Sequence, residues 1–391
     1  NSPTQGLGLV NGGWYFPIND FMNIELRGDI FLRGSWSAQT KAVYRKRYKY
    51  NGSFTYNYRF QKQGLKIYEP FGGYRVTKNF RIDWVHNQDP KAHPTRKFNA
   101  KINLQNPNFF RNGANPEDLL NGTMTTVNNT MNSGITYNQK LGRSNLTVSG
   151  NHNQNNGTQN FTTTLPKASL NVPRFFPFKT SDGKGQWYDK VGVNYSSVAE
   201  GRLKGNLETI SGKLDSIAGY DANDVLREYG QYGVKHNANM STNAKLLKYF
   251  TLNPGANFTE RWYFQRYDYS FDSTQNKAVL ADTVQGFNAV RDFGLNASMN
   301  TKIYGTFLFK KGPIKAVRHM ITPRATFNYR PDFGQPTWDY YQTFTDTLGT
   351  DLYYNRYNGF IYGAPGRGSN GSVSFNLDDN VEAKMIVKGD T

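Results

Sequence analysis

The sequence predicts an all-β protein, a transmembrane antiparallel β-barrel of the outer-membrane type. Three observations predict this class. Apolar and polar residues alternate with a period of two in runs along the chain, which is typical of strands with one apolar and one polar face. No apolar run approaches the roughly 20 residues that a transmembrane helix needs. Only 37% of the residues are hydrophobic while 15% are aromatic, which does not fit a soluble core of aliphatic side chains.

The clearest strand pair is predicted over residues 41–60, where two alternating runs meet at an Asn51-Gly52 turn. Each run has an aromatic face and an opposite polar face that carries cations. A Lys or Arg on the lipid face at mid-bilayer costs about 2–4 kcal/mol. We therefore expect the aromatic face to contact lipid and the basic face to line an aqueous lumen, where it would contact lipid phosphates. The cations expected on such a lumen face, here and in a later run, are Arg45, Arg47, Lys49, Arg59 and Arg324.

Further alternating runs follow to the end of the chain. Their polar faces are rich in Asn, Thr, Ser, Gln and Gly, which suits a hydrated interior. A strand with its connection takes roughly 25 residues, so about 14–16 strands are expected. The run over 293–309 is expected to continue past one membrane thickness. The runs lie at residues 98–105, 252–259, 293–309, 321–330 and 373–377.

The predicted strands are joined by short turns and by long loops, and outer-membrane barrels alternate the two, with the short turns on the periplasmic side. Asn capping and a Pro in the first turn predict a short helix at residues 115–120, and a second is expected from Asp221 to Tyr229. The short turns are expected at 50–53 and 310–313, and the long loops near 205–228, 267–285 and 331–360.

The net charge of +18, from 47 basic and 29 acidic residues, suits an anionic partner. Because the cations alternate with aromatic residues at strand spacing, a lined channel is favoured over a nucleic-acid surface, and no nucleic-acid partner is expected. The chain has no cysteine, so it forms no disulfide and no thiolate metal site.

No catalytic or metal motif stands out. The five histidines form no H-E-x-x-H pair, and no G-x-S-x-G or phosphate-binding glycine motif lies between a strand and a helix. We expect no enzyme activity, no cofactor and no metal. One alternative stays open, a barrel hydrolase in which His236 or His319 pairs with a serine. The histidines are His86, His93, His152, His236 and His319.

Several strings of this chain resemble the outer-membrane protein family LptD, which assembles lipopolysaccharide, and most of all its divergent branch in Bacteroidetes-type bacteria. The resemblance covers about Gly6 to Gly334. The strings include GLGLVNGGWYFPINDFMNIELRGDIFLRGSW, YRKRYKYNGSFTYNYRF, WVHNQDPKAHPTRKFNAKINL, GFNAVRDFGLNASMNTKIYGTF and IKAVRHMITPRATFNYRPDFG.

The resemblance implies a translocon in the outer membrane of a Gram-negative bacterium that inserts lipopolysaccharide into the outer leaflet. Its implied partners are lipopolysaccharide, a plug lipoprotein like LptE, the periplasmic bridge proteins and the outer-membrane lipids. It also implies that residues 1–391 are part of a barrel of about 26 strands, without the periplasmic jellyroll and the terminal strands. The cysteines of proteobacterial members are absent, which puts a disulfide-dependent assembly step in doubt.

The family's lateral seam between first and last strands suggests a role for Gly12, Gly13 and Pro17. Proline lacks the N–H that a strand ladder uses, so it weakens strand pairing. The alternative, that Pro17 only ends a strand, stays open. Two further functions also stay open: another large barrel, such as a protein-secretion channel or a nutrient transporter, and a soluble all-β adhesin.

Overall fold

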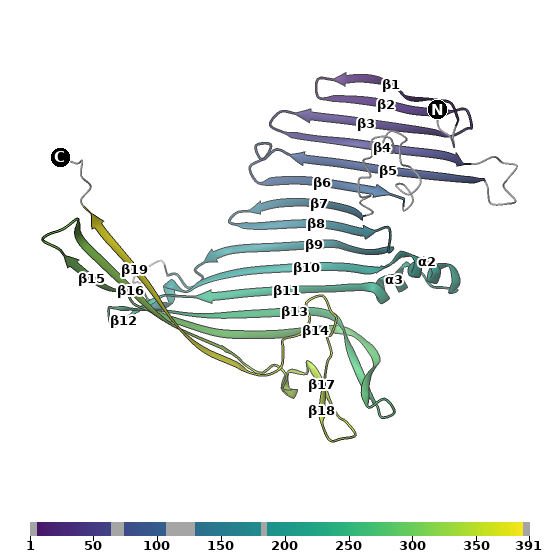
Figure 1. Ribbon diagram of the computed structural model, residues 1–391. Coiled ribbons are helices and arrows are strands. Elements are labelled where there is room, and N and C mark those ends of the chain that lie inside the picture. The colour runs from purple at the N-terminus through teal and green to yellow at the C-terminus, as the bar shows by residue number, and fades with distance from the viewer. Residues whose placement is uncertain (1–5, 64–73, 107–129, 181–185, 386–391) are drawn as a thin grey trace. The chain divides into compact units, whose positions relative to one another are not determined.

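The computed structural model describes residues 6–63, 74–106, 130–180 and 186–385. Within these residues, seventeen strands belong to one sheet, and two more form a small separate hairpin (Figure 1). Two α-helices, α2 (Leu207–Ser216) and α3 (Ala222–Tyr229), accompany them. None of the described helices has the length and apolar character needed to cross a membrane. The all-β prediction is confirmed.

The chain divides into two compact units. Unit 1 comprises Asn1–Leu170 and Ala199–Tyr232, and unit 2 comprises Asn171–Val198 and Gly233–Thr391. Strands β9, β10 and β11 contribute residues to both units. Their bounds are β9 (Asn160–Phe175), β10 (Gly192–Asn206) and β11 (Gly230–Ser241).

Unit 1 contains an antiparallel meander of eight strands, each paired with the next along the chain. Its strands have the period-two alternation that the sequence predicts, and short turns join several of them. The strands are β1 (Gly8–Asn19), β2 (Met22–Phe31), β3 (Trp36–Lys46), β4 (Tyr50–Gln63), β5 (Arg75–Gln88), β6 (Arg96–Gln105), β7 (Thr130–Leu141) and β8 (Ser144–Asn155).

Unit 2 continues with antiparallel pairs around two long central strands, β13 and β14. Strands β11 and β12 both pair with β13, and β14 and β15 both pair with β16. The described sheet has seventeen strands, more than the about 14–16 that the sequence predicts. The bounds are β12 (Ala244–Leu246), β13 (Phe250–Asp272), β14 (Lys277–Asn300), β15 (Ile303–Leu308), β16 (Ile314–Arg330) and β19 (Asn370–Met385), with the small hairpin β17 (Tyr341–Thr345) and β18 (Asp351–Asn355).

The predicted Asn51-Gly52 turn is wrong. Strand β3 ends at Lys46, residues 47–49 form the turn, and β4 begins at Tyr50. Gly52 lies opposite Tyr44 in the ladder, and a Cβ on Gly52 would overlap the Tyr44 hydroxyl and the Val85 carbonyl oxygen. The glycine therefore makes room for a tyrosine ring instead of bending the chain.

Two other sequence expectations are wrong in detail. The stretch 267–285 is not a loop, because β13 continues to Asp272 and β14 begins at Lys277. Register shifts near Tyr263 and Asp268 interrupt its alternation, which removes the pattern by which a strand is recognised. The run 293–309 is not one strand but is divided between β14 and β15 by residues 301–302.

The remaining connections agree with the sequence. The predicted loop near 205–228 holds α2 and α3, and the loop near 331–360 is the connection between β16 and β19. The helix expected at Asp221 to Tyr229 is confirmed as α3, with Asp221 as its N-cap. The helix expected at 115–120 lies outside the described residues.

Candidate functional site

In unit 1 the strand register aligns the alternating residues into two continuous faces. On the polar face, Asn57 of β4 pairs with Gln39 of β3 and Arg81 of β5. On the apolar face, Tyr56 pairs with Thr40 and Ile82. A one-residue slip would exchange the faces, so the shared register makes each face a property of the whole sheet.

The polar face of unit 1 carries both signs of charge, partly paired. Arg27 pairs with Glu25, and the Arg81 Nε lies 2.6 Å from the Asp83 carboxylate. Asn103 also donates to Asp83. The face is thus a hydrated, hydrogen-bonding surface with guanidinium groups, which bind phosphate oxygens well.

The predicted basic residues do not all lie together. Arg45 and Arg59 lie in β3 and β4 of unit 1, and Arg324 lies in β16 of unit 2. Arg47 and Lys49 lie in the turn between β3 and β4, which corrects their placement in a strand. This correction has the same cause as the misplaced turn, because β3 already ends at Lys46. The contact of these cations with cargo stays a prediction.

Unit 2 has a polar face rich in Asn and Ser. Asn296 of β14 pairs with Asn328 of β16, and Asn328 pairs with Ser372 of β19. A groove of about 390 Å³ lies over these residues and is also lined by Asp292 and Arg330. Amide, hydroxyl and guanidinium groups in one groove are suited to sugar hydroxyls and phosphates. Sequence reasoning missed this groove, although the Asn and Ser residues at alternate positions were its signal.

The opposite face of unit 2 has an apolar band of limited length. On β16 it runs from Ile321 to Tyr329, which matches the about 9–11 residues of a membrane-spanning strand. The band ends at His319, whose Nε2 lies 2.6 Å from the Asp379 carboxylate. A pocket of about 280 Å³ opens on this face. Its apolar lining includes Met299, Pro323, Ala325, Phe375 and Leu377.

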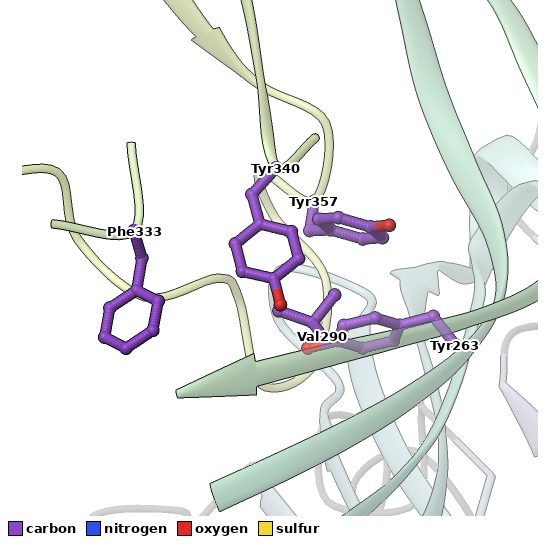
Figure 2. Close-up of a cluster of buried hydrophobic side chains, with 5 residues drawn as sticks. All are labelled: Tyr263, Val290, Phe333, Tyr340 and Tyr357. Atoms are coloured by element: carbon purple, nitrogen blue, oxygen red, sulfur yellow. The ribbon is translucent and has the colours of Figure 1, made fainter. Parts of the chain in front are cut away.

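The connection between β16 and β19 packs onto the polar face of β13 and β14. Figure 2 shows the cluster, in which Tyr340 points toward Val290. Tyr263 and Val290 come from β13 and β14, and each is fully buried. Val290 lies opposite Arg261 and shares its face with Asp292. The other members, Phe333, Tyr340 and Tyr357, come from the connection.

Hydrogen bonds fix this connection as a folded cap, here named the 331–369 cap. The Tyr263 hydroxyl donates to the Gly363 carbonyl at 2.7 Å. The Tyr340 hydroxyl accepts from the Arg291 N–H at 2.7 Å and donates to the Arg291 carbonyl at 3.0 Å. Burial raises the pKa of Tyr357 to about 12 and also raises the pKa of Tyr340. Both phenols therefore stay neutral at physiological pH.

Charged residues also hold the cap. Arg356 pairs with Asp268 of β13 and, at 3.1 Å, with Asp339. Arg266 of β13 lies 3.3 Å from Asp339. At the base of the cap, the Gly334 and Gly368 N–H groups donate to Asp332, and these bonds lower the pKa of its carboxyl group.

The candidate seam residues lie in β1. Gly12 pairs with Gly28, and Pro17 pairs with Asn23. The register is irregular on both sides of this segment, between Leu9 and Gly12 and between Pro17 and Asn19. The strand itself ends at Asn19. The seam role of Gly12, Gly13 and Pro17 stays a prediction.

The histidines considered for catalysis have partners other than serine. The His236 Nδ1 lies 2.7 Å from the Tyr195 hydroxyl, and His319 pairs with Asp379. The His152 Nδ1 lies 2.7 Å from the Thr163 hydroxyl. In the part of the chain that the structure describes, no group of three or more His, Asp or Glu residues is arranged to hold a metal ion.

A protein-family model described as LptD protein matches residues 1–391. No curated protein matches the chain.

Proposed function

Because this chain belongs to the LptD family of outer-membrane lipopolysaccharide transport proteins, we propose that its two-faced sheet is the wall along which lipopolysaccharide passes to the outer leaflet. The single observation that carries this proposal is the continuity of both faces across paired strands. Lipopolysaccharide has apolar acyl chains and an anionic, sugar-rich head. A wall that passes it needs a hydrated inner face and a lipid-contacting outer face.

The polar face supplies the chemistry for the head. Arg59 of β4 lies opposite Ser37 of β3 and Asn79 of β5. Arginine binds phosphate through parallel N–H bonds, while neighbouring Asn and Ser side chains exchange hydrogen bonds with hydroxyls. In this proposal Arg45, Arg59 and Arg324 contact lipid phosphates, and the groove of unit 2 contacts the saccharide.

The apolar face supplies the contact with the membrane. In β4 it presents Phe54, Tyr56, Tyr58 and Phe60, which pair with apolar residues such as Trp84 and Ile82. These four rings are partly exposed, and Trp36 and Phe80 on the neighbouring strands are exposed; such apolar surface is unfavourable in water because it is hydrated at a cost. The cost disappears in lipid, so we assign this face to the bilayer.

The further parts of the proposal follow from the family. Lipopolysaccharide arrives from periplasmic bridge proteins, a plug lipoprotein occupies the lumen, and cargo leaves through a seam at β1. Gly12, Gly13 and Pro17 support this position for the seam, because they lie in the first strand and Pro17 offers no N–H to a strand ladder.

Photo-crosslinking tests the proposed path. A photoreactive amino acid replaces Asn57 on the polar face, and a matched control replaces its neighbour Tyr56 on the apolar face. We expect Asn57 to capture lipopolysaccharide in cells that export it and Tyr56 to capture much less. Capture at Tyr56 but not at Asn57 would place the cargo on the wrong face. The absence of capture from three polar-face positions, Asn57, Arg59 and Asn328, would contradict the path altogether.

A further inference from the structure

The short connections on one end of unit 1 form a continuous rim. The β1–β2 turn (20–21), the β3–β4 turn (47–49) and the β5–β6 connection (89–95) are joined by main-chain hydrogen bonds. The Arg45 N–H donates to the Phe21 carbonyl at 2.7 Å, and the Asp89 N–H donates to the Lys49 carbonyl at 2.9 Å. Figure 1 shows α2 and α3 at the opposite end of these strands. The rim is therefore on the short-turn side.

The rim gathers cations around aromatic rings. The Arg47 guanidinium carbon lies 4.7 Å from the centroid of the Tyr48 ring, and the Lys91 Nζ lies 5.2 Å from the same centroid. The Lys46 Nζ lies 5.0 Å from the Phe21 ring centroid. Cation–π attraction offsets part of the repulsion between Arg47 and Lys91, which share one ring.

These cations are not neutralised by carboxylates in the described part of the chain. No ion pair is recorded there for Lys46, Arg47, Lys49 or Lys91. The Asp89 carboxylate accepts the main-chain N–H of Lys91 at 2.8 Å. Four basic residues thus outnumber the two carboxylates of the rim, Asp20 and Asp89, and Arg47, Lys49 and Lys91 are exposed.

Tyr48 is an unusual residue for its position. Its φ is +60° and the residue is 51% exposed. This left-handed conformation costs a bulky residue roughly 1–2 kcal/mol, whereas Gly or Asn adopts it readily. An exposed tyrosine gains little from burial at such a site. Its ring instead contacts the Arg47 and Lys91 cations.

The apolar face begins directly beside the rim. The His86 ring lies 5.8 Å from Tyr44, 5.9 Å from Tyr50 and 5.5 Å from Phe98, between ring centroids. The Trp84 Nε1 donates to the Tyr44 hydroxyl at 2.9 Å, and this hydroxyl lies 3.0 Å from the His86 Nδ1. Amphipathic rings of this kind gather at the level of lipid headgroups.

We propose that Arg47, Tyr48 and Lys91, flanked by Lys46 and Lys49, form a binding site for the phosphate of an anionic glycerophospholipid. The site rests on the proposed function in one respect, the assignment of the apolar face to lipid. It lies on the short-turn side, which is periplasmic in outer-membrane barrels. Its ligand belongs to the membrane leaflet on that side, and its role is separate from the cargo path along the polar face.

Lipid retention by the purified full chain tests the site. The protein is incorporated into phosphatidylglycerol or phosphatidylcholine vesicles, extracted in mild detergent, and the retained lipid is counted by native mass spectrometry. The test variant combines Arg47→Gln and Lys91→Gln. The matched control combines Lys310→Gln and Lys311→Gln, which removes the same charge from another exposed turn. Circular dichroism confirms equal strand content before lipid is compared.

We expect the wild-type protein to retain phosphatidylglycerol in preference to phosphatidylcholine. Each basic residue near an anionic surface strengthens binding about fivefold, so the test variant should bind phosphatidylglycerol about 25-fold more weakly. The control should change binding less than twofold. Tyr48→Asn keeps a residue that tolerates the left-handed turn but removes the ring, and it should weaken retention several-fold.

Other outcomes would overturn the site. Equal losses in the test and control variants would show only general attraction by net charge. Equal retention of the two phospholipids would show that the net negative charge of the headgroup plays no role at the site. Displacement of bound phosphatidylglycerol by equimolar purified lipopolysaccharide would assign the site to cargo. If the proposed cargo path is wrong but the lipid site is right, the Asn57 crosslink is absent while the preference for phosphatidylglycerol is unchanged.

Discussion

Two of the long connections are held in different ways. The α2–α3 connection packs on itself through Ile210 and Val225, which contact Phe161 of β9. The 331–369 cap instead packs onto the polar face of β13 and β14 through buried aromatic residues and arginine–aspartate pairs. The first is a small module at the end of its strands, whereas the second covers part of the proposed cargo surface.

The difference indicates which connection is able to move at low cost. The residues that join α2 and α3 on their outer side, Lys213, Tyr220 and Glu228, form exposed contacts, and exposed ion pairs stabilise little. The cap buries Tyr263, Val290 and Phe333 completely. We therefore expect the cap to stay closed over its part of the wall and the helices to open more often.

The largest effect is expected from Tyr357→Ala in the cap. The Tyr357 ring lies 5.2 Å from the Tyr263 ring and 5.7 Å from the Phe360 ring, between centroids. Its removal leaves a cavity, and truncating a buried aromatic side chain costs about 3–5 kcal/mol. Hydrogen exchange should become much faster across 331–369. Tyr56→Ala on the apolar face of unit 1 is the control, and unchanged hydrogen exchange in the cap of Tyr357→Ala would show that the cluster does not hold the cap.

The next effect is expected from Arg356→Gln. This change removes the pairs with Asp268 and Asp339 and leaves both carboxylates without that partner. Hydrogen bonds to charged groups are worth about 1.5–3 kcal/mol, so exchange in the cap should rise by one to two orders of magnitude. Arg227→Gln in α3 is the control, and it should leave the cap unchanged. Equal protection of the cap in both variants would show that the Arg356 ion pairs do not hold it.

A smaller effect is expected from Asn206→Ala at the start of α2. The Asn206 side chain accepts N–H groups of Glu208 and Thr209 at 3.1 and 3.2 Å. Loss of an N-cap costs about 1 kcal/mol, so exchange should rise in 207–216 and stay unchanged in the cap. Faster hydrogen exchange in both the α2–α3 connection and the 331–369 cap would mean that the two are coupled, contrary to their separate packing.

The smallest effect is a pH dependence of α3. The N–H groups of Asp224 and Asn223 lower the pKa of the Asp221 carboxyl group below its ordinary value. The folded pKa is therefore lower than the unfolded pKa, so this cap stabilises α3 above the unfolded value and is lost as pH falls through the folded value. Protection of 222–229 should decrease below about pH 4. In Asp221→Asn that decrease should be absent, and an identical decrease would contradict the assignment.

The strands were predictable because alternation is a local pattern. The faces over Phe54 to Phe60 and over Ile321 to Tyr329 agree with the sequence. The turn at 47–49 was not predictable, because Gly52 is required by the ring of Tyr44 from the neighbouring strand. A residue that is required by a contact with a neighbouring strand cannot be recognised from the sequence around it.

The candidate sites show the same limit. The basic residues of β3 and β4 were recognisable from their alternation, but the Tyr48 platform depends on Lys91, which is 43 positions further along the chain. The 331–369 cap also depends on distant partners, since Tyr263 and Gly363 are joined across 100 positions. Only the register and the folded connection bring such residues together.

The central claim, that the aromatic face contacts lipid and the polar face contacts water, has a direct test. Because the chain has no cysteine, a spin label is attached at one introduced cysteine, Tyr56→Cys or Asn57→Cys, in the membrane-inserted protein. The two labels lie on adjacent residues of β4 that face opposite sides. We expect the label at 56 to collide mainly with molecular oxygen dissolved in lipid, and the label at 57 to collide mainly with a water-soluble nickel chelate. The reverse result, or equal access at both positions, would contradict the claim.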